Sequence, residues 1–174
     1  SHAIYLVTAD FVNITFNTIN TTGRDADGIH LSYSDNATIK ENNIVTGGLS
    51  SSGIILYYSD FANITDNGVS TTNYGYAHWR QDSFPMRFAL SSDSYLRNNQ
   101  LNSTYGPAIF SSYISTTGGH DIDQSNTGFG LPILYNESLQ DMVVFENVDL
   151  TGIYSDIICA GCTNVTYRNV TLYN

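Results

Sequence analysis

Charged and aromatic side chains gather in two segments of the chain, residues 24–30 and 73–87. The first reads Arg-Asp-Ala-Asp-Gly-Ile-His, and the second contains the only tryptophan of the protein. Such groups suit a sugar or a uronate, because aromatic rings present an apolar face, Arg pairs with carboxylates, and a carboxylate or imidazole accepts protons. The predicted ligand-binding residues are Asp25, Asp27, His30, His78, Trp79, Arg80, Asp82 and Arg87.

The same two segments also fit a purely structural interpretation, which we favour over catalysis. Asp25 to Gly28 has the composition of an ordinary turn, and Trp79 and Phe84 can fold the second segment onto the body of the protein. Asp25 and Asp27 supply too few oxygen ligands for Ca²⁺, which takes six to eight. No His or Cys spacing indicates zinc or copper. We therefore predict no catalytic residue, no metal and no cofactor.

The two cysteines, Cys159 and Cys162, form a C-x-x-C motif. The motif lies among residues typical of strands, whereas a redox motif opens a helix, and no His follows it as in a haem attachment site. Two interpretations remain, a local disulfide or two unreactive thiols.

An internal sequence repeat predicts the fold. Residues 3–19, 28–44 and 53–69 align without a gap at a spacing of 25 residues. The aligned columns are Leu6, Leu31 and Leu56; Asp10, Asp35 and Asp60; Ile14, Ile39 and Ile64; and Asn17, Asn42, Asn67 and Asn99. We expect the isoleucine column to continue through Leu96, Ile122, Phe145 and Val165.

This period is too short for two packed helices, and its segments are short, alternating and rich in β-branched residues. Stacked coils bring like residues into register about 4.8 Å apart. Isoleucine and leucine then fill the interior, and asparagines form amide ladders. Alternation directs Ile29 and Leu31 inward and His30 outward. Residues 70–87 form the longest insertion between coils, where function often lies.

Residues 28–44, GIHLSYSDNATIKENNI, and residues 53–69, GIILYYSDFANITDNGV, resemble the right-handed parallel β-helix repeat family. That family includes archaeal surface proteins, the copper-maturation β-helix protein of denitrifiers, and polysaccharide lyases and epimerases. The resemblance implies an all-β fold, a single right-handed parallel β-helix domain of about seven coils across residues 1–174. It implies little about function, because the repeat is a scaffold.

Composition excludes several classes of function. The net charge is −10, with six Lys and Arg among 174 residues, so the basic surface that nucleic acids require is missing. No apolar run approaches the roughly 18 residues of a membrane span, and we expect no membrane insertion.

Eight N-x-Ser/Thr sequons make glycosylation a second prediction for an exported protein, although asparagine and threonine are also favoured at β-helix turns. The candidate acceptors are Asn13, Asn20, Asn36, Asn63, Asn102, Asn136, Asn164 and Asn169.

The chain begins and ends in predicted strands without a cap, so we expect either a piece of a longer protein or ends that pair with other copies. We predict an extracellular structural module of a cell-surface or sheath-like protein, serving scaffold, adhesion or self-assembly. Its expected partners are other copies, flanking domains of the same protein, or a polysaccharide. Alternatives are a carbohydrate-active enzyme fragment (lyase, epimerase or hydrolase) and a carbohydrate-binding module, both using the edge that carries residues 24–30 and 78–87.

Overall fold

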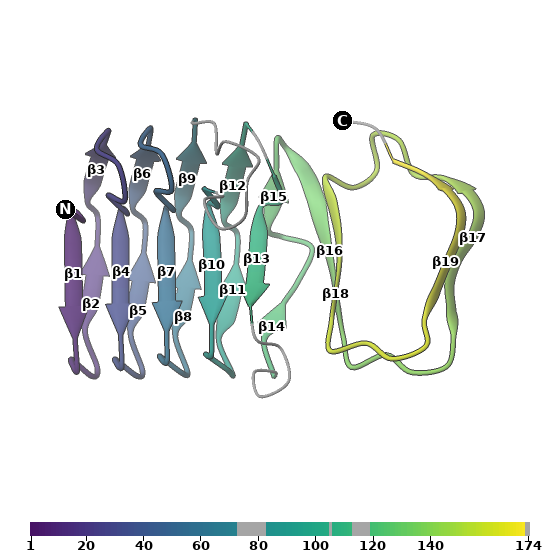
Figure 1. The fold of residues 1–174 in the computed structure, drawn as a ribbon, viewed down its shortest axis with the longest axis horizontal. Coiled ribbons are helices and arrows are strands. Elements are labelled where there is room, and N and C mark those ends of the chain that lie inside the picture. The colour runs from purple at the N-terminus through teal and green to yellow at the C-terminus, as the bar shows by residue number, and fades with distance from the viewer. Residues whose placement is uncertain (73–82, 105, 113–118, 173–174) are drawn as a thin grey trace.

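The computed structural model describes residues 1–72, 83–104, 106–112 and 119–172, and every regular element within these ranges is a strand (Figure 1). The strands stack into parallel sheets that form a single-domain β-solenoid of about six turns. Figure 1 shows the chain running down the front of the stack and up behind it as it advances, which is a right-handed winding. The predicted fold class is therefore confirmed, with about six turns in place of about seven.

Each of the first five coils contributes one short strand to each of three sheets. Sheet A consists of β1 (Ile4–Val7), β4 (Ile29–Ser32), β7 (Ile54–Tyr57), β10 (Met86–Ala89) and β13 (Ile109–Ser112). Sheet B consists of β2 (Asn13–Thr15), β5 (Thr38–Lys40), β8 (Asn63–Thr65), β11 (Tyr95–Arg97) and β14 (Asp121–Ile122). Sheet C begins with β3 (Thr18–Thr21), β6 (Asn43–Thr46), β9 (Gly68–Thr71), β12 (Gln100–Ser103) and β15 (Thr127–Gly128).

The strand register follows the sequence repeat. Leu6 pairs with Leu31 and Leu31 with Leu56 in sheet A. In sheet B the pairing joins Ile14, Ile39, Ile64, Leu96 and Ile122 in one column. The side chains of the sheet B column, with Leu31 and Leu56, are almost completely inaccessible to solvent and belong to one continuous core, against which the partly buried Leu6 packs. Burying each of them contributes about 1.5–3 kcal/mol, so the repeated apolar positions drive the stacking of the coils.

A buried asparagine ladder runs beside this core. The side-chain oxygens of Asn42, Asn67 and Asn99 each accept hydrogen bonds from the side-chain and backbone nitrogens of the asparagine one coil earlier. Asn126 extends the ladder by one coil that the sequence did not predict. The ladder satisfies polar groups that would otherwise be buried without partners, and it explains why asparagine recurs at one phase of the repeat.

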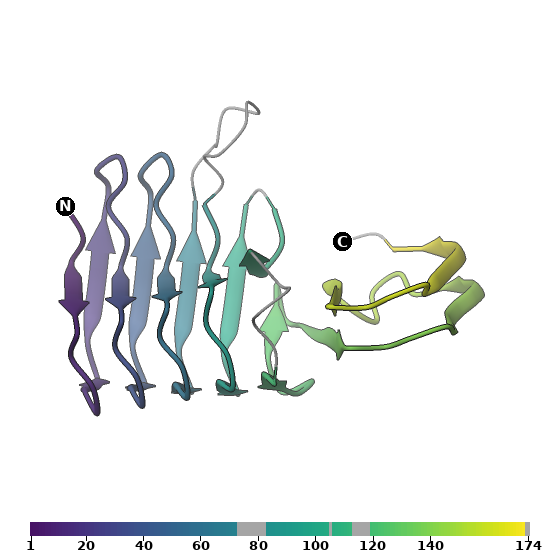
Figure 2. The same cartoon turned by 60° about the horizontal axis from the view of Figure 1, so that its bottom comes forward.

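The last four strands leave the regular stack. They are β16 (Leu131–Glu137), β17 (Val143–Asp149), β18 (Asp156–Ala160) and β19 (Thr166–Thr171). β16 pairs antiparallel with β15 through a two-residue turn at Phe129 and Gly130, both at positive φ, so the chain reverses direction there. Figure 2 shows these strands, green to yellow, set off beyond the stacked coils.

The predicted continuation of the isoleucine column beyond Ile122 is therefore wrong. β16 pairs with β18 and β17 with β19, and Phe145 lies opposite Tyr167 rather than on Ile122. Val165 precedes β19. The physical reason is the hairpin between β15 and β16, because an antiparallel pair cannot continue a parallel stack in the same direction.

Within the described residues, no helix is long and apolar enough to cross a membrane.

Candidate functional site

The outward face of sheet A carries the most chemically versatile row of side chains. Strand pairing aligns five neighbours in successive coils: Tyr5, His30, Ile55, Arg87 and Phe110. An open groove of about 630 Å³ crosses this face. Its lining residues are His30, Ile55, Tyr57, Tyr58, Arg87, Ala89 and Leu90. The volume lies within the range of small-molecule binding sites, so the groove can hold a sugar-sized ligand.

Arg87 provides a positive charge in this groove. Its Nε is buried and has no hydrogen-bond partner among the described residues, although the side chain as a whole is half-buried. A buried donor without a partner costs about 1–3 kcal/mol, and more when the group is charged. A carboxylate is the best complement, because the guanidinium fork makes two parallel hydrogen bonds to it.

Three tyrosines form an aromatic cluster at the edge of the groove. The rings of Tyr33 and Tyr58 are stacked, with centroids 5.0 Å apart and an interplanar angle of 4°. The Tyr57 ring meets Tyr58 edge-on at 4.7 Å. Tyr33 and Tyr58 both have positive φ at the turn that ends their strands, and all three side chains are exposed. Exposed, mutually supported rings of this kind suit stacking against a sugar.

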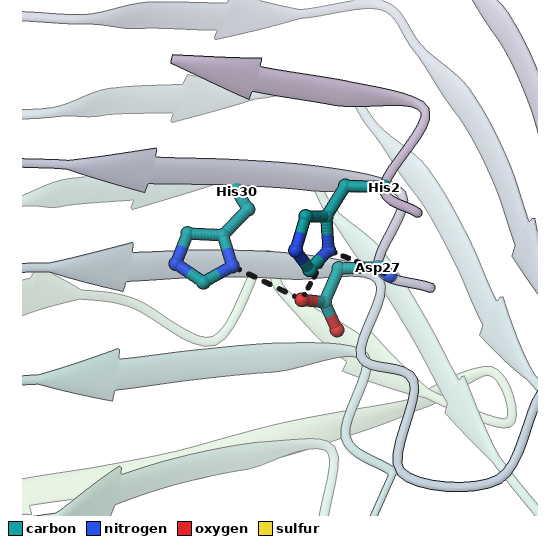
Figure 3. A group of neighbouring side chains, drawn as sticks. All are labelled: His2, Asp27 and His30. Atoms are coloured by element: carbon teal, nitrogen blue, oxygen red, sulfur yellow. Dashed lines mark hydrogen bonds and ion pairs between the residues drawn. The ribbon is translucent and has the colours of Figure 1, made fainter. Parts of the chain in front are cut away.

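The other end of the groove leads to a cluster of two imidazoles and one carboxylate (Figure 3). Asp27 Oδ2 lies 2.9 Å from His2 Nδ1 and 3.1 Å from His30 Nδ1. The Asp27 side chain is only 5% exposed, whereas His2 and His30 are 26% and 21% exposed. The imidazole rings of His2 and His30 are 4.8 Å apart, and the Tyr5 ring contacts both of them.

The repeat explains why these three side chains meet. His2, Asp27 and Ser52 occupy the same phase of the 25-residue period, so they stack in successive coils. The Ser52 backbone N–H donates to Asp27 Oδ1 at 2.8 Å, which fixes the carboxylate and leaves Oδ2 for the imidazoles. His30 follows three residues later on β4 and points outward, as its position between the buried Ile29 and Leu31 predicted.

The structure brings together only part of the predicted ligand-binding set. Asp27, His30 and Arg87 lie on or beside sheet A, with Asp27 and His30 in direct contact. Asp25 does not line the groove, because it sits in an exposed turn at positive φ with its Oδ2 3.4 Å from Arg24 Nε. His78, Trp79, Arg80 and Asp82 lie outside the described residues.

His2 is the site residue that sequence analysis missed. We expected no metal, yet in the described part of the chain the ligand atoms of His2, Asp27 and His30 all lie within 4.8 Å of one another. The spacing of 25 residues between His2 and Asp27 was the available signal, because the same spacing places Leu6 beside Leu31 and Ile14 beside Ile39.

The sequons differ in accessibility. Six of the asparagines are exposed: Asn13, Asn20, Asn36, Asn63, Asn164 and Asn169. Asn102 is half-buried and accepts a hydrogen bond from the Phe129 N–H. The side-chain nitrogen of Asn136 is buried, so a glycan there requires local rearrangement. Cys159, on β18, forms a disulfide with Cys162 in the turn that follows the strand.

Comparison with known proteins adds no relative: no protein-family model, no curated protein and no solved structure matches this chain.

Proposed function

We propose that this chain is an extracellular β-helix module that binds a carbohydrate bearing a carboxylate in the groove of sheet A, and that it serves adhesion or attachment. The observation that carries the proposal is the position of Arg87, which lines the groove and whose buried Nε has no hydrogen-bond partner in the described residues. The aromatic cluster of Tyr33, Tyr57 and Tyr58 beside it supports a sugar as the part that bears the carboxylate.

Two features support a location outside the cytoplasm. The Cys159–Cys162 disulfide is of a kind that persists in oxidising compartments. The six exposed sequon asparagines offer acceptors to a secretory glycosylation pathway.

Between His30 and Arg87, the geometry of the groove favours binding over catalysis. An enzyme site needs titratable groups that converge within hydrogen-bond reach of one reacting atom. Here the His30 and Arg87 strands are separated by β7, so their backbones lie about 9–10 Å apart at the usual strand spacing. That separation suits a ligand that spans the groove, with Ile55 as part of its floor.

The net charge of −10 limits the ligand. Long-range repulsion opposes a polyanion at low salt, but it is screened beyond about 8 Å at physiological ionic strength. Affinity therefore depends on the contact with Arg87 itself, and a short oligosaccharide with few carboxylates fits better than a densely charged polymer.

The test is calorimetric titration with oligosaccharides of a uronic acid and with their neutral counterparts. We expect the acidic series to bind. Arg87→Gln should lower the affinity about 10-fold or more, since hydrogen bonds to charged groups contribute about 1.5–3 kcal/mol. Arg168→Gln should change the affinity little. Arg168 is a matched control because its exposed guanidinium, on β19, pairs with Glu146 on β17. Equal binding of acidic and neutral sugars, or equal loss in both variants, would overturn the proposal.

The aromatic contribution is tested separately. Tyr58→Ala is expected to weaken binding several-fold, whereas Tyr95→Ala, which removes an exposed ring from sheet B, is expected to leave it unchanged.

A further inference from the structure

We infer that His2, Asp27 and His30 form a binding site for a divalent transition-metal ion of the zinc class. The inference goes beyond the proposed function and does not depend on it, because none of its steps involves a sugar or Arg87.

The spacing of the ligand atoms fits coordination of one ion. Zinc–nitrogen and zinc–oxygen bonds are about 2.0–2.2 Å long, so ligand atoms on the same ion lie about 3–3.5 Å apart. The two distances from Asp27 Oδ2, 2.9 Å to His2 Nδ1 and 3.1 Å to His30 Nδ1, match this separation. The ligand atoms of His2 and His30 lie within 4.8 Å of each other, so only a small movement of one imidazole is needed for both to reach the same ion.

Hydrogen bonding at His2 Nδ1 is in conflict without a cation. The Asp27 backbone N–H points at this nitrogen from 3.2 Å, which requires a lone pair on Nδ1. Asp27 Oδ2 lies 2.9 Å from the same nitrogen, which requires a proton on Nδ1. One nitrogen cannot satisfy both neighbours. A metal ion between Nδ1 and Oδ2 accepts a lone pair from each and removes the need for a proton between them, while the Asp27 N–H then loses Nδ1 as its acceptor.

The carboxylate is held in place for this role. Asp27 is almost completely buried, and its Oδ1 accepts the Ser52 N–H at 2.8 Å. That bond leaves Oδ2 as the ligand atom, in the way that outer hydrogen bonds orient metal ligands elsewhere. His30 is fixed by β4, and the edge contact of its ring with Tyr5, with centroids 5.0 Å apart, restricts its rotation. The site is therefore largely formed before the ion binds.

The donor set selects the class of ion. Two imidazoles and one carboxylate suit Zn²⁺, Co²⁺ or Ni²⁺, whereas Ca²⁺ and Mg²⁺ prefer oxygen ligands alone. Three protein ligands leave at least one coordination position for water or an incoming group. Both imidazoles are partly exposed, so solvent reaches the cluster.

The experiment is isothermal titration of the chelator-treated chain with Zn²⁺ at pH 7.5, followed by titration with Co²⁺ monitored by visible absorption. We expect one ion per chain, a cobalt spectrum that reports imidazole and carboxylate ligation, and a higher Tm in the presence of Zn²⁺. Asp27→Asn keeps the Oδ1 acceptor for Ser52 but removes the anionic ligand, and we expect it to weaken Zn²⁺ binding at least 100-fold. His30→Gln is expected to have a similar effect.

Asp25→Asn is the matched control, because it removes the same charge two residues away from an exposed turn. We expect this variant to bind Zn²⁺ like the unaltered chain. His30→Gln keeps the test decisive where Asp27→Asn fails to fold, because the His30 side chain is partly exposed. Absence of Zn²⁺ binding in the unaltered chain, or binding that survives His30→Gln, shows that the cluster does not form the proposed site and overturns the inference.

Discussion

The side-chain amide of Asn67 donates to the side-chain oxygen of Asn99 at 3.0 Å, although 32 residues separate them in the chain. The preceding step of the ladder, from Asn42 to Asn67, spans 25 residues, and the following step, to Asn126, spans 27. The insertion between β9 and β10 therefore lengthens one coil without breaking the ladder. Loops between the strands can therefore change length, provided that each coil still places an asparagine at the ladder position.

Replacing Asn67 tests how much the ladder contributes. Asn67 Nδ2 donates to the Ile39 carbonyl and to Asn99, and its Oδ1 accepts from Asn42. Asn67→Ala leaves several buried groups without partners, each costing about 1–3 kcal/mol, so we expect a loss of about 3 kcal/mol or more in the free energy of unfolding. The exposed neighbour Asn43 is the control, and Asn43→Ala is expected to cost less than about 0.5 kcal/mol in urea denaturation. Similar losses in the two variants would contradict a structural role for the ladder.

The fold was predictable because one period carries several residue types at once. Isoleucine, leucine and asparagine columns all repeat at 25 residues, so a single alignment specifies register, core and ladder. Asn126 was not predicted as part of the ladder, because its coil does not align with the first three coils without gaps. Phe145 was wrongly assigned to the isoleucine column because it is apolar and suitably spaced. The turn at Phe129 and Gly130, which reverses the chain, involves only two residues, and the column pattern does not reveal it.

The site was less predictable, because its chemistry comes from contacts between coils. Asp27 and His30 were predicted from their residue types, and they lie only three residues apart in the sequence. His2 was not among the predicted site residues, although the repeat places it directly beside Asp27. The groove itself depends on which outward side chains are small, such as Ala89, and on the stacking of Tyr33 on Tyr58, neither of which follows from spacing alone.

Gly53 marks a place where the backbones of successive coils pass too closely for a side chain. A Cβ at this position would lie 2.6 Å from the Pro85 carbonyl oxygen and would also collide with Val69. We expect Gly53→Ala to lower the free energy of unfolding by about 1–3 kcal/mol or more through overpacking. At Gly68 the nearest atom to an added Cβ is Asn43 Oδ1 at 3.7 Å, so Gly68→Ala should be neutral or slightly stabilising. Comparison of denaturation midpoints of the two variants checks the prediction, which fails if they are equally stable.

Arg97 links the fourth and fifth coils through two carboxylates. Its Nη2 lies 2.6 Å from Asp121 Oδ1 and its Nε 2.9 Å from Asp123 Oδ2, while the guanidinium also covers the Tyr95 ring. Lysine cannot reproduce this fork, so we expect Arg97→Lys to lose about 1 kcal/mol of stability, less at high salt. Arg168→Lys, at an exposed single pair with Glu146, is expected to lose almost nothing. A loss that does not diminish in 1 M NaCl would contradict the electrostatic explanation.

His120 should make stability depend on pH between 5.5 and 7.5. Burial lowers the pKa of its imidazole, and nearby Glu137, Asp93 and Asp60 only partly offset this effect. The neutral ring accepts the Ser94 N–H at 3.3 Å and lies against Phe88. In the unfolded chain the imidazole takes up a proton near its ordinary pKa of about 6.5, so acidification favours unfolding.

We expect this histidine to cost up to about 1.4 kcal/mol of the free energy of unfolding at pH 5.5 relative to pH 7.5. The Oδ1 of asparagine can replace Nδ1 as the acceptor for Ser94 without titrating, so His120→Asn should show a smaller loss over the same interval. The difference between the two chains isolates His120 from Asp156, whose pKa is raised by burial and which acts in the opposite direction. Urea denaturation of both at the two pH values measures it, and parallel pH profiles would show that His120 is not the group responsible.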